Sequence, residues 1–497
     1  MPNEQTPLLA DNTTASKSVL RSQPNENDLE SVSTTSSTTA REISAAEAHN
    51  VIYERFTRKE KAFILSLVSY VGLIPLFVSG SFFPSIPDIA KDLNTTGEVV
   101  SLAVSVSVLA ACFGALIGAS FASFYGRRPV YLCGLPLLCI GSVGVASSRT
   151  IGELMAWRFF QTLGVSFGIS VGAGVIGDIY RLEERGTAMG IFFAACLIGP
   201  ALAPFIGGFA AHYASWRVMQ LGLGVAGLLG FICMALYYPE TSIPGTRGID
   251  KRRAELGRDD VYLVWVNPFR ALAILRSPNI TAVSLAGFFV LLTDYALLVP
   301  MPYTVGKRYG ITNQAILGLL YVPVGIGNFV GAPFAGWLSD KTVTRMRKQR
   351  GGIWYPEDRL RATLLGAAFF VPLSVLGVGL VTEFIPGPVG LSLNLICLFF
   401  NGFGVDMVLS PSSAYVVDIM HSKSAESVAA NNGLRSFIMA IAVSGITPMI
   451  NHIGVLRTNI VVSLGAWVGF GMLWGTVRYG EGMRRWIDIG YSTAETN

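Results

Sequence analysis

The sequence predicts an all-α membrane protein with twelve transmembrane helices in two six-helix bundles. Three observations support this prediction: the composition, twelve long apolar stretches, and the distribution of Lys and Arg between them. Of the 497 residues, 51% are hydrophobic and 14% are charged, and the mean hydropathy is +0.51. A soluble domain carries roughly a quarter charged residues, so much of this chain's surface must face lipid.

Each of the twelve stretches is long enough to cross a bilayer, which requires about 20 mostly apolar residues. We expect these spans at 62–82, 99–122, 130–147, 152–176, 187–210, 217–238, 280–302, 315–338, 362–382, 389–412, 427–450 and 458–477. The chain then divides into a polar, disordered cytoplasmic tail over 1–60, a bundle over 61–238, a cytoplasmic linker over 239–279, a second bundle over 280–478 and a short tail over 479–497. The first tail is rich in Ser, Thr and Asn and too poor in aromatic residues to form a core.

Lys and Arg gather on one side of the predicted membrane. With the amino terminus in the cytosol, the inner loops contain Arg127, Arg128 and the basic runs over 247–276 and 341–361. The outer loops contain far fewer cations. Cytoplasmic loops carry an excess of Lys and Arg, so both termini are predicted to be cytoplasmic.

The remaining composition argues against several classes of protein. The six cysteines lie in apolar stretches without metal-ligand spacing, and the four histidines are scattered. They predict no metal site, no cofactor and no catalytic cluster, so we do not expect an enzyme. No Gly-x-x-x-x-Gly-Lys-Ser/Thr pattern is present, which argues against ATP as the energy source. The expected partners are protons, a small organic substrate and the lipid bilayer, without nucleic acid, and we expect a monomer.

The fifth span contains a run of glycines and prolines: Gly199, Pro200, Pro204, Gly207 and Gly208. Glycines let a neighbouring helix approach closely in lipid, where association depends on packing. Prolines remove backbone donors and bend the helix. The run suits a hinge or seal between the two halves; the alternative is an ordinary packing face of small residues.

Three of the ionisable residues within predicted spans are candidates for a functional role. Arg158 lies in the fourth span, where insertion costs about 2.5–3.5 kcal/mol unless the charge is paired or hydrated. The alternative is that its side chain reaches the outer interface. Asp294 in the seventh span and Asp406 in the tenth could bind and release protons, or could instead form salt bridges or line a polar cavity. Further polar candidates for the cavity lining, and so for substrate binding, are Gln161, Tyr295, Asn328 and Asn401.

Two inner loops carry related charged motifs. The loop after the second span contains Gly126, Arg127 and Arg128, and the corresponding loop after the eighth contains Asp340 and Lys341. The two copies indicate an internal repeat, as expected of transporters built from two similar halves.

Taken together, these segments resemble the major facilitator superfamily, and in particular its fungal drug:proton antiporter branch with twelve spans. The run from Gly199 to Gly208 resembles the antiporter motif of that branch. The resemblance covers about residues 60–480. It implies the major-facilitator fold with pseudo-twofold symmetry, and for Arg158 it implies a role in proton coupling.

The first charged loop departs from the family pattern Gly-x-x-x-Asp-Arg-x-Gly-Arg-Arg, because Ser123 and Phe124 replace its acid and first arginine. A charge latch through that acid cannot operate here. We expect control of the inward gate to rest on the second copy, or on Arg127 and Arg128 with other partners.

The resemblance implies a secondary transporter that exports drugs, toxins or secondary metabolites by proton antiport through alternating access. The alternatives are an uptake symporter or facilitator of the same fold, a vacuolar sequestration transporter, or a non-transporting sensor. We expect the plasma membrane, although Glu4-Gln-Thr-Pro-Leu-Leu9 is similar to a sorting signal that would favour a vacuole. Asn94 begins an Asn-Thr-Thr glycosylation sequon in the first outer loop; the alternative is a sequon present by chance.

Overall fold

The computed structural model describes residues 53–243, 245–257, 264–420, 424–487 and 490–491, without the side chains of residues 182, 183, 185, 186, 424 and 425. The described residues from Phe56 onward form one compact unit. Most of the expected tail over 1–60, including the dileucine run, lies outside the described residues, as does the end of the second tail.

The described residues form helices and no strand. In chain order they are α2 (Arg58–Gly80), η1 (Phe83–Ser85), α3 (Ile86–Asp92), α4 (Gly97–Tyr125), α5 (Arg127–Ser147), α6 (Ile151–Leu163), α7 (Gly168–Ile179), α8 (Leu182–Tyr213), α9 (Trp216–Tyr237), α10 (Gly248–Leu256), η2 (Pro268–Arg276), α11 (Pro278–Leu298), η3 (Pro302–Gly306), α12 (Gln314–Leu320), α13 (Val322–Gln349), η4 (Pro356–Ala362), α14 (Thr363–Leu365), η5 (Gly366–Phe370), α15 (Val371–Phe384), α16 (Gly387–Ile419), α17 (Ser424–Ile453) and α18 (Val455–Trp486).

Within this part of the chain, 12 helical segments are long and apolar enough to cross a membrane, which confirms the predicted number. Several extend beyond the expected ends. The first reaches from Arg58 through α3 to Asp92, and α18 continues past 478 to Trp486. Polar residues are tolerated at these ends, so an apolar window alone underestimates helix length.

Small hydroxyl residues start many of the helices. Thr96, Thr150, Ser215 and Ser277 each accept a hydrogen bond from a backbone N–H in the first turn of α4, α6, α9 and α11. Each bond satisfies one of the donors that a helix start leaves without an intrahelical partner. The sequence therefore encodes these helix starts locally, where the chain leaves the apolar region.

The fourth span is broken, whereas the sequence predicts one continuous helix over 152–176. α6 ends at Leu163 and α7 begins at Gly168. At Gly164 the backbone lies so close to α5 that a Cβ atom would stand 2.6 Å from the backbone nitrogen of Leu138. The close approach of α5 thus accompanies an interruption that local hydrophobicity does not reveal.

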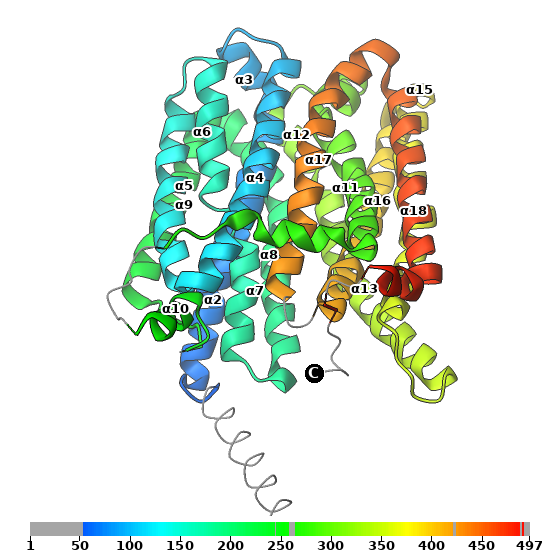
Figure 1. The fold of residues 1–497 in the computed structure, drawn as a ribbon. Coiled ribbons are helices and arrows are strands. Elements are labelled where there is room, and N and C mark those ends of the chain that lie inside the picture. The colour runs from blue at the N-terminus through cyan, green and yellow to red at the C-terminus, as the bar shows by residue number, and fades with distance from the viewer. Residues whose placement is uncertain (1–52, 244, 258–263, 421–423, 488–489, 492–497) are drawn as a thin grey trace, which may run out of the picture. The chain divides into compact units, whose positions relative to one another are not determined.

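The two ends of the bundle differ in the short helices that lie near them. We call the end nearer to α10 the linker end, and the opposite end the α3 end (Figure 1). The linker contains the short helices α10 and η2 between its polar segments.

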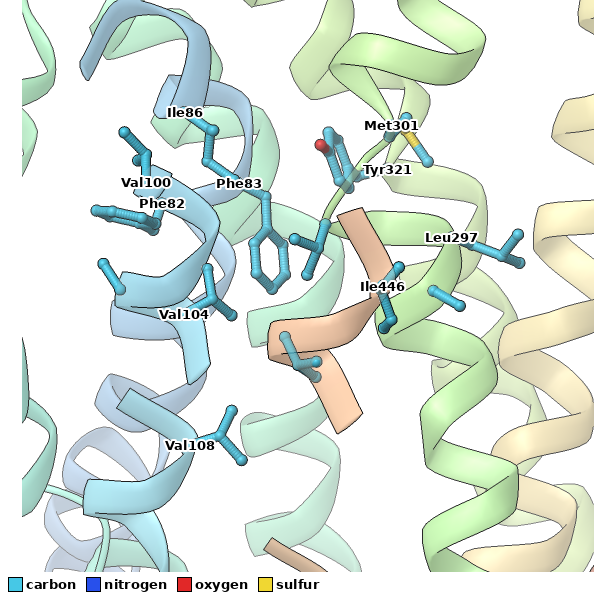
Figure 2. Packing of buried hydrophobic residues seen from close by; sticks show 14 of the residues in the cluster. Phe82, Phe83, Ile86, Val100, Val104, Val108, Leu297, Met301, Tyr321 and Ile446 are labelled. Atoms are coloured by element: carbon cyan, nitrogen blue, oxygen red, sulfur yellow. The ribbon is translucent and has the colours of Figure 1, made fainter. Parts of the chain in front are cut away.

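The two bundles share buried residues. One cluster at the α3 end combines Phe83 and Val104 of the first bundle with Leu297, Tyr321 and Ile446 of the second. Figure 2 shows the Phe83 side chain between the helices of the two bundles. The Phe83 ring stacks on the ring of Tyr321, with centroids 6.2 Å apart.

Side-chain hydrogen bonds also join the bundles at the α3 end. They link Asp88 to Gln314 (2.7 Å), Glu98 to Asn451 (3.1 Å) and His212 to Asn313 (3.3 Å). The α3 end is therefore closed by both apolar and polar contacts between the halves.

Candidate functional site

The Gly/Pro run of α8 lies where the two bundles meet. On one side, Gly207 packs against the backbone of Ser81 just after α2. On the other, Gly208 packs against Gln314 and Gly318 of α12. These glycines leave no room for a Cβ atom, which explains why the run combines small residues. The structure thus places the run at a contact between the halves; its gating role stays a prediction.

A second close contact follows along α8. Gly325 of α13 lies directly against the backbone of Ala201. α8 is therefore packed through small residues against α12 and the first turns of α13. This contact joins the two bundles while the α3 end is closed.

Arg158 is 1% exposed and lies inside the first bundle. Its Nη1 donates to the carbonyl of Val78 at 3.1 Å and to Gln161 Oε1 at 2.9 Å. Its guanidinium lies 4.3 Å from the centre of the Phe82 ring, a cation–π contact that is favourable when desolvated. The alternative that Arg158 reaches the outer interface is wrong, because these partners hold the charge inside the bundle.

Gln161 connects Arg158 to two further helices. Its Nε2 donates to Ser142 Oγ of α5 and to Gln220 Oε1 of α9, each at 2.9 Å. Gln161 is fully buried. Within the described chain Arg158 forms no ion pair with a carboxylate, so this network disperses its charge through neutral groups.

The two deep acids of the second bundle lie at similar depth. From the linker end, Asp294 is about 24 Å along α11 and Asp406 about 20 Å along α16, at 1.5 Å per residue. Asp294 is 8% exposed. Asp294 Oδ1 and Asp406 Oδ2 are buried without a hydrogen-bond partner, and no ion pair involving either acid is found in the described residues. The structure thus provides two carboxylates in the interior whose hydrogen-bonding capacity is not filled.

Arg435 of α17 completes this group, about 16 Å from the linker end. Its charge interacts with Asp406 and with Tyr295, and Asp406 also interacts with Asp294. Its Nη2 donates to Asn432 Oδ1 at 3.0 Å, while its Nε has no partner. We call Asp294, Asp406 and Arg435 the charged cluster.

Arg435 is not among the site residues predicted from the sequence. The span expected over 427–450 contains it, so the rule that singles out Arg158, an arginine inside a span, applies equally to Arg435.

The candidate lining residues of the second bundle occupy different places. Tyr295 faces the first bundle, where its ring meets that of Phe83 edge to face at 6.4 Å. Asn401 is fully buried, and its Nδ2 donates to Thr293 and Ser374 at 3.1 Å each. Asn328 lies against Gly402, and its Oδ1 has no hydrogen-bond partner. Tyr295 is therefore at the contact between bundles, whereas Asn401 ties helices within one; substrate binding by these residues stays a prediction.

The arginines of the first charged loop pair with acids from outside that loop. Arg127 Nε binds Asp178 Oδ2 at 3.0 Å. The backbone N–H groups of Arg127 and Arg128 donate to the Glu240 carboxylate at 2.9 and 3.1 Å. Gly126, with φ of +109°, turns the chain so that the start of α5 points at this carboxylate. Glu240 is thus an anion bound at a helix N-terminus, a favourable position for negative charge.

Phe124, which replaces the first arginine of the family pattern, packs against Gly248 of α10. At the position where the family pattern has its first arginine, this chain therefore makes an aromatic contact with the linker. In this chain the loop is attached to the linker and to α9 rather than latched through a carboxylate of its own.

The second charged loop forms a parallel network. Arg359 binds Asp418 at 2.7 Å and Asp340 at 3.3 Å. Lys341 instead lies over the Trp337 ring, 4.7 Å from its centre. Asp178 and Asp418 are thus both partners of arginines from neighbouring helices, while the partner of Asp340 is Arg359 and not the adjacent lysine.

We expect Glu240→Gln to lower the free energy of unfolding by about 1–3 kcal/mol, because the variant loses charge-assisted hydrogen bonds from the α5 backbone. Burial alone would raise the pKa of Glu240, but hydrogen bonds from Ser242, Arg127 and Arg128 lower it below its ordinary value of 4.5. A lowered folded-state pKa gives stability that is complete above pH 4.5 and is lost as the pH falls through the folded-state pKa.

Thermal unfolding of the purified chain at several pH values measures this effect. Glu383→Gln serves as the control, because it removes an exposed acid at the end of α15. The hydrogen bond from Arg308 goes to the backbone carbonyl of Glu383, which the substitution leaves in place. Equal unfolding temperatures for the Glu240→Gln variant and the wild type at pH 7 would contradict the prediction.

Asn94 lies in the exposed turn before α4, at the α3 end. Its φ of +49° is unusual for a residue other than glycine but tolerated by asparagine. The side chain is accessible, and its glycosylation stays a prediction.

Comparisons with known proteins agree with this architecture. Residues 68–444 match the sequence profile described as "Major Facilitator Superfamily". Citrate exporter 1 of Aspergillus niger is 26% identical, covering 92% of this chain and 93% of that protein. Efflux pump radE of Floropilus chiversii is 27% identical over 76% of this chain and 72% of that protein. MFS antiporter QDR3 of Candida albicans is 22% identical over 80% and 75%, respectively.

A solved structure shares the fold. The bacterial homolog of the human lysosomal transporter Spinster, in an inward-facing and unoccupied conformation, matches with a TM-score of 0.63 and 12% identity. The match covers 86% of this chain and 99% of the bacterial one. At this identity the likeness concerns the arrangement of the helices alone.

Proposed function

Because this chain belongs to the Major Facilitator Superfamily, we propose that it exports small organic molecules from the cytosol by proton antiport. The observation that carries the proposal is the charged cluster, in which two carboxylates each have a buried oxygen without a hydrogen-bond partner. An ionisable residue inside a membrane span is costly and marks an ion or substrate pathway. The printed names of the relatives, an exporter, an efflux pump and an antiporter, support the direction.

The charge of the cluster explains how antiport would operate. With both acids ionised, Asp294, Asp406 and Arg435 sum to one negative charge. A proton and a substrate that is cationic or donates hydrogen bonds then compete for the same carboxylate oxygens. Binding of one displaces the other, and protons entering from outside release the substrate there. The two bundles would rock about this site, which alternately faces each side.

The orientation follows from the positive-inside rule. The linker end, with its many cations, lies in the cytosol and the α3 end lies outside. The bonds of Asp88 and Glu98 to the second bundle then close the outer side. They must break in the outward-facing part of the cycle. Asn94 would lie outside, where a glycosidase-sensitive shift in mass tests its modification.

One observation favours a second candidate, an uptake symporter. Arg435 is a partly buried cation that could hold an anionic substrate. Protonation of Asp294 and Asp406 would free Arg435 from their charges, so the proton and the anion would bind together. The sign of coupling therefore depends on the charge of the substrate.

Transport into everted plasma-membrane vesicles distinguishes the candidates. We expect a fluorescent cationic dye to accumulate when the vesicle interior is acidic. This accumulation should stop when a protonophore removes the pH gradient. Citrate serves as the anionic test substrate. Loss of either compound from acid-interior vesicles, driven by the proton gradient, would favour the symporter and contradict export. A fluorescent tag in the same host distinguishes the plasma membrane, which we propose, from the vacuole.

A further inference from the structure

The linker between the bundles forms a strap over residues 264–277, which we call the linker strap. Figure 1 shows this green segment between α10 and α11 crossing α4 and α17. The Tyr125 hydroxyl donates to the Val264 carbonyl at 2.6 Å and accepts from the Val264 N–H at 2.8 Å. At the other end, the Thr281 hydroxyl donates to the Leu275 carbonyl at 2.6 Å. The strap is therefore fixed to both bundles.

One side of the strap is packed into the protein. η2 is a 3₁₀-helix, in which every third residue faces the same way. Its buried positions follow that period: Pro268, Ala271 and Ile274. Ala271 and Ile274 belong to one apolar cluster with residues of both α4 and α17, among them Leu116 and Ala430. The strap thus covers the seam between these two helices.

The exposed side of η2 also repeats every third residue, but it carries basic side chains in addition to an alanine. Arg270, Ala273 and Arg276 are exposed. At about 2 Å rise per residue, the two arginines lie on one line about 12 Å apart. Neither forms an ion pair with any residue that the structure describes. Two cations along one edge of a membrane protein thus have no protein partner in this region.

Aromatic side chains flank the arginines. Trp265 is 87% exposed and Phe269 is 49% exposed. The Phe269 ring meets the ring of Phe113 edge to face at 6.5 Å, which places it beside a membrane-spanning part of α4. Exposed Trp beside Arg is typical of the boundary between lipid tails and headgroups.

We propose that the exposed side of the linker strap binds the headgroups of anionic phospholipids, with Arg270 and Arg276 on the phosphates and Trp265 and Phe269 among the acyl chains. The bound lipid holds the strap against the α4–α17 seam. This site goes beyond the proposed transport function and does not depend on its direction.

Thermal unfolding of the full chain in detergent, titrated with short-chain lipids, tests the proposal. The probes are dioctanoyl phosphatidylserine, dioctanoyl phosphatidylcholine and inorganic phosphate. We expect phosphatidylserine to raise the unfolding temperature at lower concentrations than phosphatidylcholine does. Phosphate alone should have no effect, because it lacks the chains that contact Trp265 and Phe269.

The Arg270→Gln/Arg276→Gln double variant removes the cations while preserving the buried side of η2. A basic residue near an anionic surface strengthens binding roughly fivefold, so the double variant should bind phosphatidylserine about 30-fold more weakly. Its affinity for phosphatidylcholine, whose headgroup has no net charge, should fall much less. Trp265→Ala should weaken the binding of both lipids.

The matched control is Arg252→Gln on α10, an exposed arginine that is paired with Glu255. It should bind phosphatidylserine as the wild type does. The proposal is overturned if the double variant keeps wild-type affinity for phosphatidylserine, or if phosphate alone reproduces the stabilisation. A failure of transport leaves this binding measurement unaffected, so the two proposals fail independently.

Discussion

Replacing Asp406 by Asn is expected to abolish proton-driven transport, with a decrease of at least about 100-fold, while the chain still folds. The amide has nearly the same volume as the carboxylate but cannot bind and release a proton. Asp406 is the acid whose charge interacts with both Asp294 and Arg435. The loss should therefore be larger than for Asp294→Asn, which we expect to reduce transport about 10-fold.

The pH gradient across vesicles provides the measurement. Exchange of substrate for substrate, which needs no net proton movement, should persist in Asp406→Asn and shows that the site is intact. The exposed Glu383→Gln variant serves as the control for the loss of an acid. Normal transport by both single variants under an imposed pH gradient would show that neither carboxylate couples protons.

The second large effect is expected at the contact between α8 and α13. A Cβ atom on Gly325 would overlap the backbone of Ala201, which cannot move aside as a side-chain end would. We expect Gly325→Val to destabilise the state in which the α3 end is closed by about 3 kcal/mol, which lowers its population about 100-fold. Each bundle keeps its own core, so the variant should still fold but should transport poorly. Gly325→Ala should show a smaller loss.

Gly336 provides a control on the same helix, because a Cβ atom at this position would have no other atom within 4 Å. Gly336→Ala should transport normally. Opening of the α3 end can be followed through Leu317→Cys, since Leu317 is 3% exposed in the shared cluster. A membrane-impermeant maleimide should label this cysteine faster in Gly325→Val. Wild-type transport together with unchanged labelling would contradict the role of the contact.

The sequence predicted the fold class because the bilayer selects on local properties. Apolar length specifies a span, and the position of Lys and Arg relative to each span indicates orientation. Breaks within a span cannot be predicted from apolar length or from the positions of Lys and Arg. The break after Leu163 depends on the approach of α5 to Gly164, which involves a separate helix.

For the candidate site, sequence reasoning identified individual residues but not their partners. It selected Asp294 and Asp406 because acids are costly in a membrane, and the same cost applies to Arg435, which it missed. It also selected Arg158, but its bond to Val78 of α2 and its link through Gln161 to α5 and α9 could not be foreseen. The departure at Ser123 indicated that the first loop needs other partners, and the structure supplies Asp178 and Glu240.

By itself, the sequence determined the number of spans and the two-bundle plan, since both follow from residues near one another in the chain. Only the tertiary structure decided which side chains meet. Phe83 and Tyr295 touch although many spans separate them along the chain. The charge of Arg435 interacts with that of Asp406 from another helix, and the linker strap covers a seam between helices of different bundles. Such contacts depend on how helices pack, and packing is set by the complementarity of whole surfaces rather than by any local pattern.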